Sequence, residues 1–238
     1  MIPLRDNAAK RRLTPINSLL IVINVAVFAY EVSLGPQVEA FVRRYAMVPL
    51  RITDSLRMPM VADLPAALVR SVEPILTIFT AMFVHGGVLH VVGNMLYLFI
   101  FGAAVEWRLG SIRFLFFYFA SGVAAAIATI LIAPQSGVPV IGASGAIAGV
   151  LGAYFIFYPR GRITTILPLF IYIQIIEVPA VLYLLLWFAL QLYSGLAEGT
   201  PSTVAGGVAW WAHIGGFLFG LALAPLLARR EAFRGRSR

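Results

Sequence analysis

The chain contains 238 residues, of which 61 % are hydrophobic and 12 % are charged, and its mean hydropathy is +0.91. These values exclude a soluble globular domain and predict an integral membrane protein. The net charge of +8 does not indicate a nucleic-acid partner, because the basic residues stand in short runs between apolar segments, where the positive-inside rule places them. The sequence has no cysteine, which excludes disulfides, a cysteine-ligated metal site and a thiol nucleophile.

Residues 1–15 are polar and basic and lead into an apolar run from Ile16 to Leu34, about the length that crosses a bilayer. The run does not end in a small-residue cleavage site, so we expect a retained first helix rather than a signal peptide. Residues 35–74 contain Pro49, Pro59, Pro65 and Pro74, spread along the segment, and many apolar side chains. We expect this connection to be a long, membrane-associated first loop with short helices, whose backbone groups need cover.

Further apolar segments predict five more spans, over about residues 87–106, 111–133, 142–158, 178–194 and 207–227. The fourth span has only about seventeen residues, at the short limit for crossing, so we expect it to begin below the membrane surface. Residues 163–174 are predicted to be an interfacial or partly buried segment. The sequence therefore predicts an all-α integral membrane protein with six transmembrane helices.

The distribution of charge predicts the topology. Thirteen of the eighteen basic residues lie in the N-terminal segment, the turns at 107–113 and 159–162, and the C-terminal tail, and the connections at 134–141 and 195–206 have none. We therefore expect both termini to be cytoplasmic. The excess of arginine over lysine hints at a GC-rich bacterial genome and hence at the bacterial inner (plasma) membrane. The predicted division is a basic N-terminus (1–15), a helical domain (16–228) and a basic tail (229–238).

Ser144 is a candidate nucleophile at the start of the fourth span. Gly142 and Gly145 leave room for another group to approach its hydroxyl. The amide N–H of Ser144 would have no partner in the first turn of a helix and could act as half of an oxyanion hole. The alternative is that small residues at four-residue spacing serve only close helix packing.

His213 is a candidate general base in the sixth span. A series of small residues at four-residue spacing begins one residue before it: Ala212, Gly216, Gly220 and Ala224. Such a ladder lets two helices approach closely, and the fourth span carries a matching ladder below Ser144. Two facing ladders would bring the imidazole to the hydroxyl, as a serine–histidine dyad requires. The alternative is a buried histidine that only bonds a neighbouring helix.

His90 and Asn94 lie four residues apart and therefore share one face of the second span. Both can donate hydrogen bonds to a developing negative charge. Asn94 would lie roughly 10 Å below the outer surface at 1.5 Å per residue, a depth that His213 and Ser144 could share. His85 is as well explained by capping the preceding loop as by catalysis. We expect no metal, because no His-Glu-x-x-His run exists and no carboxylate shares this level.

Three motifs in this order carry a family resemblance: HGGVLHVVGN over residues 85–94, GASG over 142–145, and AHIGG over 212–216. The sequence resembles the rhomboid family of intramembrane serine proteases from about residue 16 to 228. The resemblance implies a rhomboid-like six-helix bundle whose activity needs no cofactor or metal. It further implies substrates that are single-pass or multi-pass proteins of the lipid bilayer, cut after a small residue.

The resemblance also implies roles for individual residues. Ser144 would be the nucleophile and His213 its general base, with no third acidic member. The oxyanion would be bound by His90, Asn94 and the Ser144 amide, and structural residues near the site would be His85, Gly142, Gly145 and Gly216. The segment from Glu106 to Gly110 is similar to a structural charged element of the family. Ala148 replaces an aromatic residue that in some members stacks on the catalytic histidine.

Two other functions are compatible with a polytopic membrane protein. A non-catalytic rhomboid-like protein would bind membrane clients, but such relatives lack the serine or the histidine, and this chain has both. A transporter is less compatible, because the chain shows no clear internal repeat and no matched unwound segments.

Overall fold

The computed structural model describes residues 2–7, 14–57, 73–169, 172–198 and 209–229. Within this part, five helical spans are long and apolar enough to cross a membrane. They are α1 (Pro15–Ser33), the continuous run of α5 (Val88–Tyr97), η2 (Leu98–Gly102) and α6 (Ala103–Leu109), then α7 (Ser111–Ile132), α9 (Ala180–Glu198) and α10 (Trp210–Leu227). The predicted helical membrane bundle is confirmed. A crossing by the shorter α8 (Ser144–Phe157), the sixth expected span, stays a prediction.

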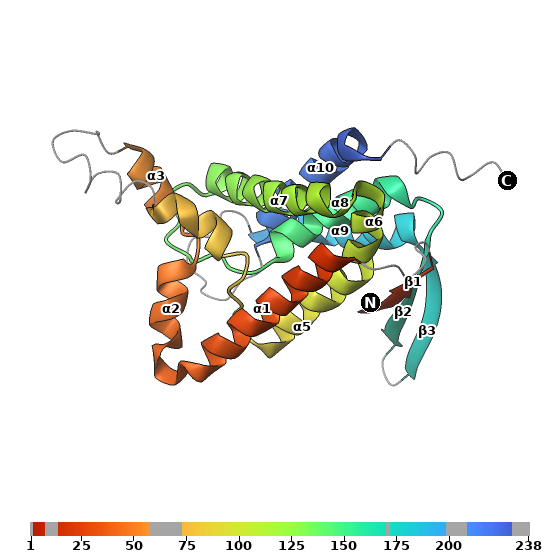
Figure 1. Cartoon of the computed structure of the whole chain (residues 1–238), viewed down its shortest axis with the longest axis horizontal. Coiled ribbons are helices and arrows are strands. Elements are labelled where there is room, and N and C mark those ends of the chain that lie inside the picture. Colours follow the sequence, from red (N-terminus) through yellow and green to blue (C-terminus); the bar gives the residue numbers. More distant parts are fainter. Residues whose placement is uncertain (1, 8–13, 58–72, 170–171, 199–208, 230–238) are drawn as a thin grey trace.

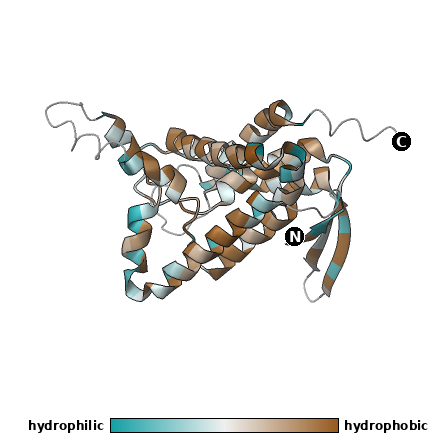
Figure 2. Cartoon of the chain, in the orientation of Figure 1, coloured by the Kyte–Doolittle hydropathy of each residue, from teal (hydrophilic) through white to brown (hydrophobic). Residues whose placement is uncertain are grey.

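Helix α8 forms the centre of the bundle, and eleven of its fourteen residues are buried. Figure 1 shows α7 and α8 across the middle of the molecule, with α1 and α5 running side by side. The outer helices are hydrophobic over most of their length (Figure 2), and they expose large apolar side chains such as Leu131, Leu190 and Leu226. A helix that is apolar on all sides is typical of a membrane span, in which the side chains that do not pack on other helices contact lipid.

Small residues bring the backbones of α8 and α10 into direct contact. A Cβ built on Gly216 would overlap the carbonyl of Gly145, and one built on Gly220 would overlap the carbonyl of Gly149. The two ladders therefore face each other as the sequence predicts, and the approach of these helices depends on the missing side chains. This contact sets the distance between the first turn of α8 and the first turn of α10.

Glu106 in α6 joins three elements at the end of the second span. Its carboxylate accepts hydrogen bonds from the backbone N–H groups of Ile16 (3.2 Å) and Asn17 (2.7 Å) and from the hydroxyl of Ser111 (2.6 Å). A carboxylate at the start of a helix satisfies unpaired amides and complements the helix dipole. These contacts anchor the N-terminus of α1 against α6 and α7.

A three-stranded antiparallel sheet in the order β1-β2-β3 lies beside the bundle and was not predicted. Its strands are β1 (Ile2–Asp6), β2 (Arg162–Leu169) and β3 (Tyr172–Pro179). Residues 163–174, which we expected to be an interfacial or partly buried segment, belong to the β2–β3 hairpin, and the strands themselves were not foreseen. Ile163 and Val178 turn toward the bundle and are buried, whereas Ile173 and Ile175 are exposed. Asp6 accepts a 2.9 Å hydrogen bond from the hydroxyl of Tyr154 in α8.

The first loop contains the short helices η1 (Gly35–Gln37), α2 (Val38–Tyr45) and α3 (Pro49–Arg57), and residues 73–80 are also helical. Residues 58–72 lie outside the described part. Met47 pairs with Val140 through two backbone hydrogen bonds, of 3.1 and 2.8 Å. The loop is thereby attached to the connection that leads from α7 into α8, and its residues Val42 and Pro49 line the same cavity as Ser144.

Candidate active site

Ser144 occupies the first turn of α8, where amide N–H groups have no partner within the helix. The preceding Gly142 has φ of +111° and donates its N–H to the carbonyl of Ala81 over 2.8 Å. A Cβ at Gly142 would lie 2.7 Å from Nε2 of His90. Both the backbone conformation and the close approach therefore require glycine two residues before the serine.

The hydroxyl of Ser144 and Nε2 of His213 lie 2.8 Å apart, within hydrogen-bond distance. His213 stands in the first turn of α10 and is buried, whereas Ser144 is half-buried. The pairing follows from the contact of α8 with α10, since Gly216 lies one turn below His213. The structure thus brings together the two residues that the sequence analysis paired.

The other nitrogen of His213 contacts a residue that the sequence analysis missed. Nδ1 lies 2.7 Å from Oε1 of Gln191 in α9. The rings of Trp187 and Trp210 flank the imidazole at centroid distances of 5.9 and 6.4 Å. These aromatic contacts come from α9 and α10, which explains how the ring can be held although Ala148 offers no aromatic group. A glutamine inside an apolar span was the signal that could have identified Gln191.

His90 and Asn94 lie on one face of α5, beside the start of α8. Nδ1 of His90 accepts a 3.3 Å hydrogen bond from the N–H of Gly86, so Nε2 carries the ring proton and points toward Gly142. The Nδ2 group of Asn94 is buried and has no hydrogen-bond partner among the described residues. A Cβ on Gly142 would lie 3.5 Å from this Nδ2. Two donors therefore face the same space next to Ser144.

His85 belongs to the loop before α5. Its Nδ1–H donates to the carbonyl of Phe83 over 3.1 Å, and its backbone N–H lies 3.2 Å from each carboxylate oxygen of Glu31 in α1. Burial, reinforced by the neighbouring His90, lowers the pKa of His85 to about 4. His85 is not among the residues that line the cavity around Ser144. These contacts fit a residue that holds the loop in place.

A cavity of about 750 Å³ is lined by Ser144, His213, His90 and Asn94, among other residues. It extends toward Val42 of the first loop and Ser136 of the α7–α8 connection. The lining is polar around the serine and also includes Thr129 and Glu198, whereas most of its other residues are apolar. Within the described ranges, no group of three or more histidine, aspartate or glutamate residues could hold a metal ion.

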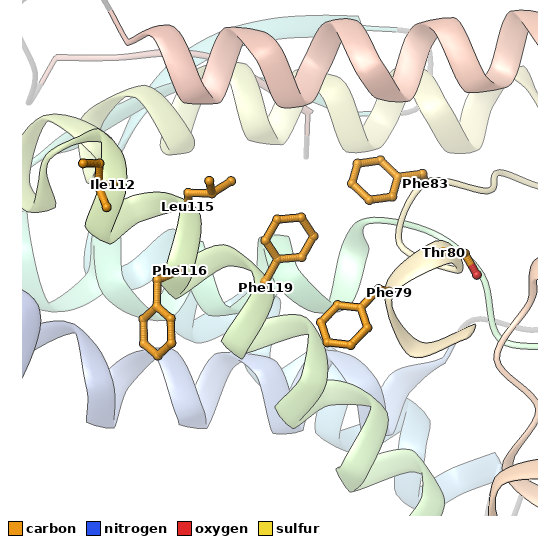
Figure 3. Close-up of a pocket in the computed structure, with 7 residues that line it drawn as sticks. All are labelled: Phe79, Thr80, Phe83, Ile112, Leu115, Phe116 and Phe119. Carbon is orange, nitrogen blue, oxygen red and sulfur yellow. The ribbon is translucent and has the colours of Figure 1, made fainter. Parts of the chain in front are cut away.

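A second hollow, of about 650 Å³, lies between residues 79–83 and α7 (Figure 3) and shares no lining residue with the first. Its lining is aromatic and aliphatic apart from Thr80: Phe79, Phe83, Ile112, Leu115, Phe116 and Phe119. The hydroxyl of Thr80 is already bonded to the carbonyl of Tyr45. This hollow carries no candidate for chemistry.

The fold and the site define a helical membrane protein that encloses a serine–histidine pair. Residues 73–230, more than half of the chain, match the sequence model of the Rhomboid domain. The protein therefore belongs to the rhomboid family, as the sequence motifs predicted.

Three relatives illustrate how far the similarity extends along the chain. RHOMBOID-like protein 1 of Arabidopsis thaliana is 31 % identical over 146 residues, which are 56 % of this chain and 37 % of the relative. RHOMBOID-like protein 6, mitochondrial, of the same plant is 32 % identical over 165 residues, 67 % of this chain and 48 % of the relative. Rhomboid protease GluP of Bacillus subtilis (strain 168) is 43 % identical over 76 residues, 32 % of this chain and 14 % of the relative. The match spans less than half the length of each relative.

Proposed function

We propose that this protein is an intramembrane serine endopeptidase that hydrolyses peptide bonds in or near the transmembrane segments of membrane proteins. The observation that carries the proposal is the 2.8 Å contact between the Ser144 hydroxyl and His213 inside a helical membrane bundle. Membership of the rhomboid family supports it, since one relative is named as a rhomboid protease. The reaction uses Ser144 and His213 as a catalytic dyad and needs no cofactor or metal.

In the proposed reaction, Nε2 of His213 takes the proton of the Ser144 hydroxyl while Oγ attacks the carbonyl carbon of the scissile bond. The tetrahedral intermediate collapses when the imidazolium gives this proton to the leaving amine, and an acyl-enzyme remains. A water molecule then loses a proton to His213 and attacks the ester. Ser144 regains its proton, and a new carboxyl terminus is released.

Negative charge develops on the carbonyl oxygen of the substrate in both steps, and three donors are available to bind it. They are Nε2–H of His90, Nδ2–H of Asn94 and the amide N–H of Ser144. Both side-chain donors lie next to Gly142, which supports their role in binding the oxyanion. Donors that already point to the place where the negative charge develops lower the activation barrier, because they need not move during the reaction.

The geometry of a membrane substrate adds a requirement. The carbonyl groups of a transmembrane helix are hydrogen-bonded within that helix, so the substrate must unwind locally before Ser144 can attack. Helix-breaking residues near the outer end of its span should therefore favour cleavage. We further propose that both termini of the protease are cytoplasmic and that it lies in a bacterial plasma membrane, with the site in the outer half.

The test is cleavage of a panel of single-span proteins by the purified protease in proteoliposomes, with the cut positions mapped by mass spectrometry. We expect wild-type protein to cut in or near the span and Ser144→Ala to cut nothing. A client-binding protein without catalysis is the alternative. It would retain the single-span proteins equally in wild type and Ser144→Ala and would cut none of them.

A further inference from the structure

Gln191 is a buried amide in the apolar helix α9, with only 7 % of its surface exposed. Burying an amide in a membrane-spanning helix is unfavourable unless both ends find partners. Both ends of Gln191 do. Oε1 lies 2.7 Å from Nδ1 of His213, and Nε2 lies 3.2 Å from the carbonyl oxygen of Trp187.

The contact with Trp187 determines which way the amide faces. A backbone carbonyl can only accept a hydrogen bond, so the group that points at Trp187 must be the NH₂ group of Gln191. The amide oxygen is then the group that faces His213, and it can only accept. Nδ1 of His213 must therefore carry the ring proton and donate it to Gln191.

This orientation has a chemical consequence at the other side of the ring. A neutral imidazole with its proton on Nδ1 has its lone pair on Nε2, the nitrogen that lies 2.8 Å from the Ser144 hydroxyl. The opposite tautomer would point an N–H at Ser144 and could not take its proton. An interhelical bond that served packing alone could equally use the NH₂ group of the amide, but that orientation would select the wrong tautomer.

We propose that Gln191 is the positioning residue of the dyad: it holds His213 in the tautomer and rotamer that act as general base. This inference rests on the proposed function. Gln191 does not touch the reacting atoms, and its effect passes through His213. Trp187 contributes twice, by orienting the amide through its carbonyl and by flanking the imidazole with its ring.

The first test compares three variants in proteoliposomes, with active sites counted by complete fluorophosphonate labelling so that misfolded protein does not contribute. Gln191→Met keeps the length of the side chain but removes the acceptor, and we expect kcat per active site to fall about 10²-fold, at the low end of what a positioned general base contributes. KM should change less than about twofold, because the loss is confined to the chemical step. Gln191→Glu keeps an oxygen that can accept the hydrogen bond from Nδ1–H of His213, so its kcat should stay within about tenfold of wild type.

Leu190→Met is the matched control, because it introduces the same side chain one residue away at a position that is 61 % exposed. We expect it to behave as wild type. Wild-type kcat per active site in Gln191→Met would overturn the proposal. Equal losses in Gln191→Met and Gln191→Glu would also overturn it, because the role would then not be to accept a hydrogen bond.

A second measurement needs no variant. In wild-type protein labelled with ¹⁵N-histidine, the His213 resonances should show Nδ1 protonated and Nε2 unprotonated at neutral pH. The reverse assignment would overturn the role of Gln191 even if the protease is active. Failure of the proposed function is a different result, in which wild-type protein neither cleaves the panel nor reacts with the probe.

Discussion

Replacing Gly142 by alanine should strongly lower catalytic activity, although most molecules should remain folded. The φ of +111° is one that an L residue adopts only with strain, which costs about 1–3 kcal/mol. The new Cβ would also lie 2.7 Å from Nε2 and 2.8 Å from Cε1 of His90, closer than these atoms can pack. The His90 ring must therefore move away from the space beside Ser144.

Loss of one oxyanion donor lowers kcat by about 10²- to 10³-fold in serine hydrolases, and we expect a decrease of this size for Gly142→Ala. KM should change little, because the donor acts on charge that develops only in the transition state. The assay is cleavage of a single-span reporter in proteoliposomes, with thermal unfolding followed in parallel.

Gly137→Ala is the matched control, because it lies in the same connection between α7 and α8 and a Cβ there meets nothing within 4 Å. It should keep wild-type kcat. If Gly142→Ala were as active as Gly137→Ala, the argument that Gly142 makes room for the His90 donor would be refuted.

Three further predictions concern other parts of the bundle. Asn94→Ala should lower kcat by about 10²- to 10³-fold with little change in KM, and an unchanged kcat would remove Asn94 from the oxyanion site. Gly220→Ala should destabilise the protein by about 1–3 kcal/mol in equilibrium unfolding, because its Cβ would overlap the Gly149 carbonyl, and an unchanged stability would contradict this close packing. The pKa of His85 is about 4 in the folded protein and about 6.5 in the unfolded chain, so the unfolded state binds more protons between these pH values. The free energy of unfolding should therefore fall as pH decreases through this window, by roughly 3 kcal/mol from this group. His85→Gln should weaken that dependence, and an identical pH profile of unfolding for both proteins would argue against the shift.

The parts of the fold that sequence reasoning could predict are those governed by local pattern. Long apolar runs predicted the spans, because a bilayer requires about twenty apolar residues from each crossing helix. The small-residue ladders predicted the contact of α8 with α10, since Gly216 and Gly220 leave no side chain between the backbones. Once that contact is known, the pairing of Ser144 with His213 follows from their positions in the first turns of the two helices.

The sheet could not be predicted in the same way, because its pairing is non-local. Ile2 pairs with Ile166, and Asp6 pairs with Ile163, across more than one hundred and fifty residues of intervening chain. The β-branched residues of 163–176 suit strands, but an apolar stretch near a membrane is equally compatible with the interfacial segment that we expected. Only the partner strand from the N-terminus distinguishes these possibilities.

Gln191 illustrates a different limit. A polar side chain in an apolar span is costly and therefore a candidate for function, and this argument applies to Gln191 as it does to His213 and Asn94. The sequence does not show which face of α9 the glutamine occupies, so its contact with Nδ1 of His213 became visible only when α9 and α10 were placed together.

The central claim is that His213 activates Ser144 in a pocket within the membrane bundle. The most direct measurement is labelling by a fluorophosphonate probe in native membranes, with the modified residue identified by mass spectrometry. The account predicts a single modified serine, Ser144, in wild-type protein and no labelling of Ser144→Ala or His213→Ala. Labelling that persists in Ser144→Ala, or that proceeds at the wild-type rate in His213→Ala, would contradict it.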